Sequence, residues 1–382
     1  MAVFRIGVYN GAREFRCQIG NPTELRATIR DNMVSTLWLT VPLDHPRIDE
    51  LLADDARLKV DFKGEHLISG PVTEWEGETD GVSGYLTVAV EDDSRMLREI
   101  LGFPVPGALV GGQGAAEYRT YTGDAETIIK TAVTENGVNR MQIPGLTVAP
   151  NLNRGAVVPS GIPFRMHPLA DKLFPAATDA GLSVTVEQQG TSLVLDVREP
   201  VTHPRSLSVA GRTLKSARWT RTRPKASCVI TGGPGEGVER NFRYLVDQPR
   251  EAQYAMRAEV FQDARDAKDD PEEGLVAAVI MDDRGREALA ENGPKSGVEI
   301  QLADSGIFQY GPGGFRVGDR IPINLGNGVT VTEVLRECTL EWVSPTYAKV
   351  EPQVGEIVNQ PDAVLRKQVA ALARSKRDQE RR

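Results

Sequence analysis

The histidines of this chain show no metal-binding or catalytic spacing. His45, His167 and His203 each precede a proline, a context that favours turns and extended segments, and His66 stands apart from them. None lies in an HExxH motif, and nothing near them supplies an identified nucleophile. The sequence therefore predicts neither a catalytic nor a metal-binding histidine.

Neighbouring carboxylates are the residues that best fit hydrolytic chemistry. A glycosidase uses two carboxyl groups, and Glu74 with Glu76, or Asp92 with Asp93, supplies such a pair. This spacing does not decide between a hydrolytic and a structural role, so a glycosidase stays open. Because Glu74 and Glu76 flank Trp75 at strand spacing, we favour a solvated face opposite a buried indole.

The glycine-rich segments lack the features of a phosphate-binding loop. TGGPGEGV at 231–238 has no Lys-Ser/Thr ending, and its Pro234 removes an amide donor. GGQG at 111–114 precedes no strand-to-helix dinucleotide turn, and GPGG at 311–314 leads into a hairpin. We therefore expect flexible connectors here and no cofactor site.

The cysteines are few and far apart. Cys17, Cys228 and Cys338 have no CxxC spacing, so neither a zinc site nor a disulfide framework is predicted, and we expect three small buried apolar side chains. The patterns of the cysteines, the histidines and the glycine-rich loops together predict no catalytic, cofactor-binding or metal-ligating residues.

Composition places the chain among soluble globular proteins. It has 382 residues, of which 40% are hydrophobic and 26% charged, enough for two to four compact units. The formal charge of −8 disfavours a protein that neutralises nucleic-acid phosphates, although an acidic channel that lets DNA slide past is compatible with it. No apolar run reaches the length of a membrane span, and the N-terminus lacks a signal pattern, so we expect folding in a cytoplasm.

Strand patterns alternate with helical ones and predict an α+β, β-rich fold. It contains two β-barrel-like domains, a small α+β domain between them and a helical insertion in the second barrel. The tryptophans Trp38, Trp219 and Trp342 are expected in or against the barrel cores. The predicted units are 1–103 (first barrel), 104–205 (small α+β), 206–247 (second barrel, first part), 248–295 (inserted helical α+β unit), 296–350 (second barrel, second part) and 351–382 (C-terminal helix and basic tail).

The last barrel strands are predicted from the segment 315–343. Ile321 and Ile323 face one way in the first strand, and the Gly326-Asn327-Gly328 turn leads into a second strand. The apolar phase then slips, which predicts a bulge near Glu333. We expect residues 206–247 and 296–345 to fold as one unit.

Helices are predicted at 94–101 with Ser94 as N-cap, from 122–124 to a stop at Gly137, and at 169–180. Strands 182–188 and 192–198 form a hairpin. In the insertion we expect helices at 249–267 and 284–291, with a strand at 275–281 between them.

The C-terminal helix carries an apolar stripe that includes Val364, Leu365, Val369 and Leu372. Because it follows the last barrel strand, we interpret the stripe as an interaction surface for a neighbouring protein, with a frayed terminal helix as the alternative.

Four stretches resemble a known family: the strands up to Asp92, GDAETIIKTAVTENGVNR at 123–140, VGDRIPI at 317–323 with its hairpin, and PDAVLRKQVAALARSKRDQ at 361–379. They are similar to the minor tail protein, or baseplate hub, family of long non-contractile-tailed actinobacteriophages, the central hub of the tail tip.

This resemblance implies a homotrimer whose two barrels per chain form a pseudo-sixfold ring that continues the hexameric tail tube. The implied partners are the distal tail (tube-end) protein, tip and fibre proteins, and the tape measure protein. DNA passes through the channel without specific binding, and neither cofactor nor membrane is involved. The implied location is the virion tail tip, after assembly in the host cytoplasm.

The function predicted from the sequence is thus that of a structural virion protein without enzymatic activity. Two alternatives remain open, a tail-associated cell-wall hydrolase and a receptor-binding tail protein.

Overall fold

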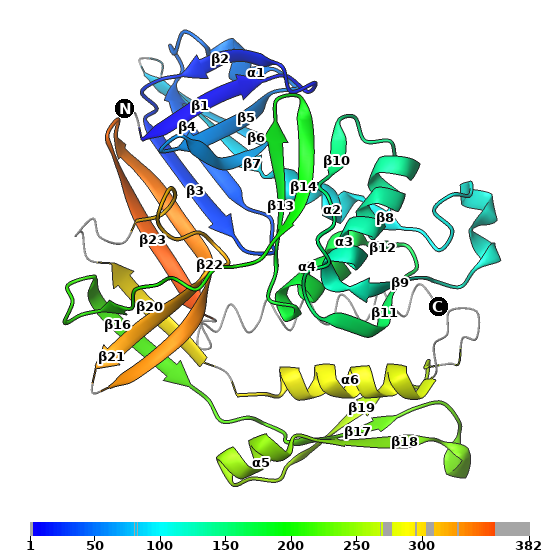
Figure 1. Ribbon diagram of the computed structural model, residues 1–382. Helices are drawn as coiled ribbons and strands as arrows, with labels where there is room; N and C mark the ends of the chain where they lie inside the picture. Colours follow the sequence, from blue (N-terminus) through cyan, green and yellow to red (C-terminus); the bar gives the residue numbers. More distant parts are fainter. Residues whose placement is uncertain are drawn as a thin grey trace.

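The computed structural model describes residues 3–355 except 80, 82, 268, 270–276, 295, 303–308 and 327. Strands dominate, and apart from the short helix α1 in the N-terminal unit the helices gather in a small unit and in an insertion (Figure 1). The predicted α+β, β-rich class is confirmed. No pairing among the described strands closes either half of the main sheet into a barrel. None of the described helices is long and apolar enough to span a bilayer.

The N-terminal unit is an antiparallel sheet with the strand order β3-β4-β7-β6-β5-β1-β2. Alternation of side chains forms it: Leu37 and Leu39 are fully buried, whereas Trp38 between them is exposed. A short helix α1 (Ile48–Leu52) covers one end. The strands are β1 (Phe4–Tyr9), β2 (Phe15–Ile19), β3 (Glu24–Arg30), β4 (Thr36–Pro42), β5 (Arg57–Phe62), β6 (Glu65–Thr79) and β7 (Gly84–Glu91).

The long strand β6 changes partner along its length. Its first part pairs with β5 and its second part with β7, and the register shifts between Val72 and Glu74, where the second pairing begins. Such an irregularity bends the strand, so the sheet folds over its own core.

A second unit holds the strands β15 (Leu207–Ser208), β16 (Leu214–Arg221), β20 (Ser296–Leu302), β21 (Arg320–Gly326), β22 (Val329–Ser344) and β23 (Tyr347–Gly355). The β21–β22 hairpin confirms the predicted one, and Ile321 and Ile323 are fully buried as expected. The bulge predicted near Glu333 lies slightly further along the strand, between Leu335 and Glu337, because β22 there leaves β21 and begins to pair with β23.

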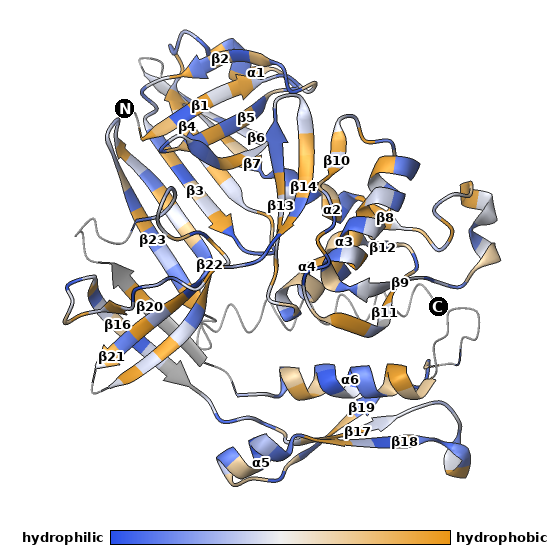
Figure 2. Cartoon of the chain, viewed as in Figure 1, coloured by the Kyte–Doolittle hydropathy of each residue, from blue (hydrophilic) through white to orange (hydrophobic). Residues whose placement is uncertain are grey.

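The two units have the same strand order. Apart from β2, the first reads β1-β5-β6-β7-β4-β3 and the second β15-β21-β22-β23-β20-β16, so each of these six strands has a counterpart in the other unit. Strand β22 also pairs with β3, which joins both units into one sheet of thirteen described strands over a single apolar core. Hydrophobic and hydrophilic residues alternate along β3, β22 and β23 (Figure 2).

The small unit lies against one side of this sheet (Figure 1). The predicted hairpin is present as β13 (Ser183–Gln189) and β14 (Ser192–Arg198), and the predicted helix at 169–180 is α4 (Leu169–Asp179). Its other elements are α2 (Met96–Glu99), β8 (Leu101–Gly102), β9 (Arg119–Asp124), α3 (Ala125–Val133), β10 (Leu146–Val148), β11 (Val157–Phe164) and β12 (His167–Pro168).

Two helix-end predictions in this unit are wrong. The N-cap of the first helical segment is Asp92 and not Ser94, because the Asp92 side chain accepts a hydrogen bond from the Ser94 amide. Gly137 does not stop α3, because the chain continues as a wider π-helical stretch to Arg140. The glycine is needed there for packing, since a Cβ would lie 2.9 Å from Leu146.

The insertion is a separate three-stranded sheet, β18-β17-β19, with helix α6 on one face. It contains β17 (Cys228–Gly232), β18 (Phe242–Val246), α5 (Gln248–Tyr254), β19 (Glu259–Asp263) and α6 (Ala277–Glu291). The assignment of β17 and β18 to the second barrel is therefore wrong, because they pair only with each other and with β19. The insertion starts after β16, so of the range 206–247 only β15 and β16 share a sheet with 296–345.

Other local predictions in the insertion also change. Only 248–254 of the expected helix at 249–267 is helical, and Glu259–Asp263 is a strand. The expected strand at 275–281 overlaps the start of α6, whose second half is the predicted helix 284–291. The domain limits as a whole stay a prediction.

The three cysteines are buried, as predicted. Trp38, Trp75 and Trp219 are not core residues, because they are 42%, 38% and 57% exposed, whereas Trp342 packs partly buried against the main core. The predicted interaction stripe, Val364, Leu365, Val369 and Leu372, lies outside the described residues.

Candidate functional site

The adjacent acids Asp92 and Asp93 hold structure together. Asp92 accepts hydrogen bonds from the Ser35 and Ser94 amides, and burial raises its pKa to about 6. Asp93 is 2.6 Å from Arg57 and accepts from Ser69, yet burial still raises its pKa. Both carboxylates are thus engaged inside the protein and do not meet in a cleft.

The other acidic residues and the histidines considered for catalysis do not come together in a site either. Glu74 and Glu76 lie exposed on one face of β6. His66 contacts Ser69 at 3.2 Å, and burial, followed by the nearby Lys59, lowers its pKa to about 4. His45 and His167 accept backbone amides two residues away. Among the described residues, no His, Cys, Asp or Glu cluster could hold a metal ion.

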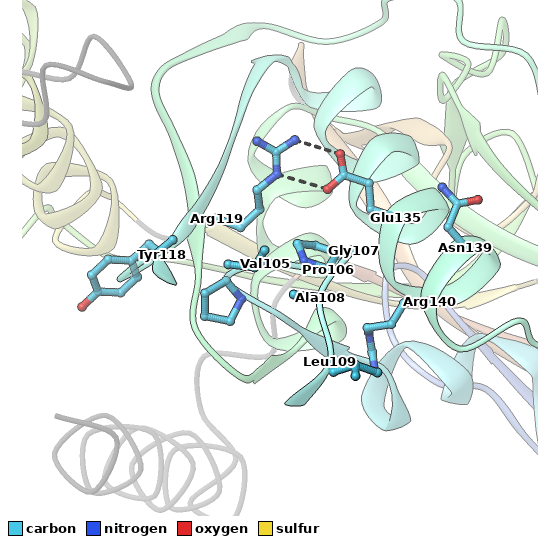
Figure 3. A pocket seen from close by; sticks show the side chains of 12 residues that line it. Val105, Pro106, Gly107, Ala108, Leu109, Tyr118, Arg119, Glu135, Asn139 and Arg140 are labelled. Atoms are coloured by element: carbon cyan, nitrogen blue, oxygen red, sulfur yellow. Dashed lines mark hydrogen bonds and ion pairs between the residues drawn. The ribbon is translucent and has the colours of Figure 1, made fainter. Parts of the chain in front are cut away.

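A pocket of about 760 Å³ opens between the loop 104–109 and the end of the helical segment 134–140 (Figure 3). The Glu135 carboxylate in its lining accepts from Arg119 and from the Tyr121 hydroxyl, and burial raises the pKa of Tyr121. Arg140 stacks on Phe103 at 3.8 Å. Among the described residues that line the pocket, Glu135 is the only carboxylate and is paired with Arg119, so they do not supply the two carboxyl groups that a glycosidase needs.

The outer face of the joined sheet is another candidate functional surface. It runs over β6, β7, β4, β3, β22 and β23, with the core on its other side. Glutamates outnumber basic side chains on it. The acidic residues are Glu24, Glu74, Glu76, Glu78, Glu91, Glu337, Glu341 and Glu351, and the basic ones are Arg26, Arg30 and Lys349.

Ion pairs cross the junction of the two units on this face. Arg30 lies 2.7 Å from Glu337, and Arg26 lies 3.6 Å from Glu341. Both pairs connect β3 to β22, whose backbones are hydrogen-bonded over Glu337–Arg30 to Glu341–Arg26. Because the pairs are partly exposed, their contribution to the free energy of unfolding is at most about 1 kcal/mol each, and they chiefly fix the register.

Buried polar contacts fix the small unit against both halves of the sheet. Asp31 at the end of β3 accepts from Ser183 of the hairpin at 2.6 Å and from Arg336 of β22 at 3.0 Å. Arg198 of the hairpin lies 2.6 Å from Asp319 of the second unit. The two halves are therefore held in one arrangement by a third element as well as by strand pairing.

Several strand edges of the sheet have no partner among the described strands, and besides the outer edges of β2 and β15 they include those of β6 and β16. Residues 74–79 of β6 pair only with β7, and β16 pairs only with β20. Both edges carry a tryptophan, Trp75 and Trp219, with exposed side chains. Unprotected edges are sites where another strand can add.

The described geometry can be compared with known proteins. A model of the family described as Siphovirus ReqiPepy6 Gp37-like protein matches residues 5–356. The chain belongs to this family. The siphovirus resemblance drawn from the sequence is confirmed. A search of curated proteins gives no match.

Three solved structures similar to this Gp37-like chain are tail proteins, two of them from prophages. The 43 kDa tail protein of prophage MuSo2 from Shewanella oneidensis shares 15% identity, with a TM-score of 0.57 over 94% of this chain and 99% of that chain. Prophage tail protein gp18 from Listeria monocytogenes EGD-e shares 11% identity, with a TM-score of 0.56 over 97% and 99%. The tail protein from Neisseria meningitidis MC58 shares 11%, with 0.55 over 93% and 97%. At these identities, the similarity establishes the fold that the chain shares with tail proteins.

Sequence reasoning missed the open edges of β6 and β16 in this Gp37-like fold. Trp75 was assigned to a core because it alternates with Glu74 and Glu76, and Trp219 was expected in or against a barrel core. The polar residues around each tryptophan, in EWEGE and ARWTRT, fit a strand edge that is exposed in the single chain as well as they fit a solvated face opposite a buried indole.

Proposed function

We propose that the chain is a structural hub of the phage tail tip, present as a homotrimer that joins the tail tube to the distal tip. The observation that carries this proposal is the repeated strand order of the two units within one sheet. Three copies would present six similar units, which is the number that a sixfold tube needs at its end.

The acidic outer face supports a role in the DNA channel. If this face lines the ring, its glutamates repel the phosphates of passing DNA, which favours transit without binding. The ion pairs of Arg26 and Arg30 to Glu341 and Glu337 leave few cations free on the face to hold a phosphate.

The proposed partners are the distal tail (tube-end) protein, the tip and fibre proteins and the tape measure protein. The proposed location is the virion tail tip, reached after assembly in the host cytoplasm. The role is structural, because the candidate carboxylates Asp92 and Asp93 serve as a cap and an ion-pair partner.

Electron microscopy of phage particles tests the proposal. Antibody or a tag on the chain should mark the tail end, and a reconstruction should contain three copies around the axis. Label along the tube, on the capsid or on no part of the virion would overturn the hub. Sedimentation of the purified chain shows whether the trimer forms before assembly.

A receptor-binding role is the second candidate, favoured by one surface. Phe242, Tyr244 and Phe261 are each more than half exposed on the face of the inserted sheet that α6 does not cover. Aromatic side chains of this kind bind partners through their apolar area. Adhesion of the purified chain to host cells, lost on changing Phe242 and Phe261 to Ser, would support this candidate.

A further inference from the structure

We propose that neighbouring copies of this chain join by antiparallel pairing of β6 of one copy with β16 of the next, in the register that joins β22 to β3 within a copy. This inference rests on the proposed ring of chains and specifies its contact between copies. It follows from the repeat, because β6 corresponds to β22 and β16 corresponds to β3.

The correspondence of β6 and β22 is fixed residue by residue through their bulges. In β6 the pairing with β7 shifts between Val72 and Glu74, and in β22 the pairing with β23 shifts between Leu335 and Glu337. Glu74 to Glu78 therefore correspond to Glu337 to Glu341. Gly77 takes the position of Leu340.

The correspondence of β3 and β16 follows from one row of paired residues across four strands. In the first unit the row is Val72, Val90, Leu37 and Ala27. In the second unit it is Leu335, Val354, Val298 and Trp219. Trp219 therefore takes the position of Ala27, and Arg218 takes that of Arg26.

Exposure differs at the corresponding positions as the proposal requires. Residues 337–341 are buried or partly buried because β3 covers them, whereas residues 74–78 are all exposed. Trp219 is 57% exposed although Ala27, its counterpart, is fully buried. One seam of the sheet is filled within the chain, and no described strand occupies the equivalent seam.

The side chains that would meet in the equivalent seam are complementary. Within the chain, the large Leu340 lies opposite the small Ala27. Between chains, the large Trp219 would lie opposite Gly77, where an added Cβ would meet no atom of the described residues within 4 Å. The large residue thus lies on β22 in the seam within the chain and on β16 in the seam between chains. Pairing would bury the indole against the neighbour's sheet.

Charge is complementary as well. Arg26 and Glu341 form an ion pair at 3.6 Å across the filled seam. Their counterparts, Arg218 and Glu78, carry the same charges and are exposed in the single chain. In the inferred register they lie opposite each other, so each copy neutralises one glutamate of its neighbour.

Cysteine pairs in assembled tails test the register directly. Gly77→Cys with Trp219→Cys, and Glu78→Cys with Arg218→Cys, place two thiols on adjacent cross-strand pairs. Because such pairs alternate between the wide and the close spacing, one of the two has Cα atoms about 4.5 Å apart. Oxidised tails should show covalent multiples of the 41.7 kDa chain, up to three, in a non-reducing gel.

The matched control is Glu78→Cys with Trp219→Cys, a slip of one residue that puts the thiols on opposite faces of the sheet. This control and the single variants should give only the background of the buried native cysteines. Tails that contain the variant chain but show no cross-link from either pair overturn the pairing, while the hub proposal stands. Absence of the chain from wild-type tails overturns the hub proposal itself.

A charge exchange covers the case in which cysteine variants fail to assemble. Glu78→Arg and Arg218→Glu should each lower incorporation into tails at least fivefold, and the double variant should restore most of it. Glu76→Arg, on the same face but opposite Thr220, should change incorporation less than twofold. A double variant as defective as the single ones contradicts the inferred contact.

Discussion

The buried pair Arg57–Asp93 shows how polar residues hold the units together. Its side chains are 9% and 3% exposed, and the same Arg57 reaches Gln188 of the β13–β14 hairpin at 3.4 Å. Asp93→Ala leaves the guanidinium buried without its carboxylate, so we expect the free energy of unfolding to fall by about 3–5 kcal/mol. Urea unfolding followed by circular dichroism measures this loss.

The control for Asp93 is Asp263→Ala, which removes the partner of Arg240 from an exposed pair in the insertion. Solvent screens such a pair, so the expected loss is under about 1 kcal/mol. Equal losses for the two variants would show that the Asp93 pair is not a buried anchor.

Asp92 and His66 should change the free energy of unfolding with pH in opposite directions. The pKa of Asp92 is raised to about 6, so the folded chain keeps a proton that the unfolded chain releases near pH 4, and stability falls as pH rises through this window. The pKa of His66 is lowered to about 4, so stability falls as pH drops from about 6.5 to about 4.

Asp92→Asn should therefore gain stability relative to the wild type as pH rises from 4 to 6, and His66→Gln should gain as pH falls from 6.5 to 4. Each difference should reach about 1–3 kcal/mol over its window. Denaturant unfolding at four pH values checks both. Parallel profiles for variants and wild type would refute the assigned causes.

Residue alternation predicted the buried face of the strands correctly, as at Ile321 and Ile323. It failed for Trp219, because alternation tells which side of a strand faces inward but not whether the same chain covers that position. Whether Trp219 is covered depends on which strand lies next to β16, and strand neighbours are set by pairings between residues distant in sequence. For the same reason, the sequence did not indicate Gly77 as a position of the inferred contact.

At the scale of elements, the insertion is attached through the two ends of one antiparallel pair. Arg221 at the end of β16 pairs with Ser296 at the start of β20. Replacing residues 223–294 by a short turn should therefore leave the joined sheet folded, since closing a shorter loop lowers the entropic cost. Retained strand signal and a cooperative thermal transition would confirm this, and a chain without one would refute it.

The boundary of this insertion was not predictable from local patterns. The stretch 228–246 was correctly predicted to contain two strands. The spacing of these strands along the sequence fits the second barrel as well as a separate sheet. Only the parallel pairing of β17 with β19 decides the matter, and it depends on a strand read from the sequence as a helix. The order of the large units, by contrast, follows from hairpins and turns along the chain.

At the scale of the whole molecule, the acidic face should speed DNA transit. Glu24 and Glu76 lie in one row of the sheet, with Thr40 and Thr87 between them. Changing both to Lys adds cations that attract phosphates, so we expect DNA release from purified virions to slow at least twofold, and more at low salt. Unchanged release in particles with normal amounts of the chain would show that this face does not line the channel.

The β22–β3 junction has a consequence for the kinetics of assembly. Because both strands belong to one chain, this seam forms on folding and does not depend on protein concentration, as for any linked pair of binding sites. In a ring of such chains, every second seam is complete before two copies meet, and only the others require collisions. A ring can then gain or lose units only two at a time. A ring with one chain too many or too few therefore differs from a sixfold tube by two units and not by one.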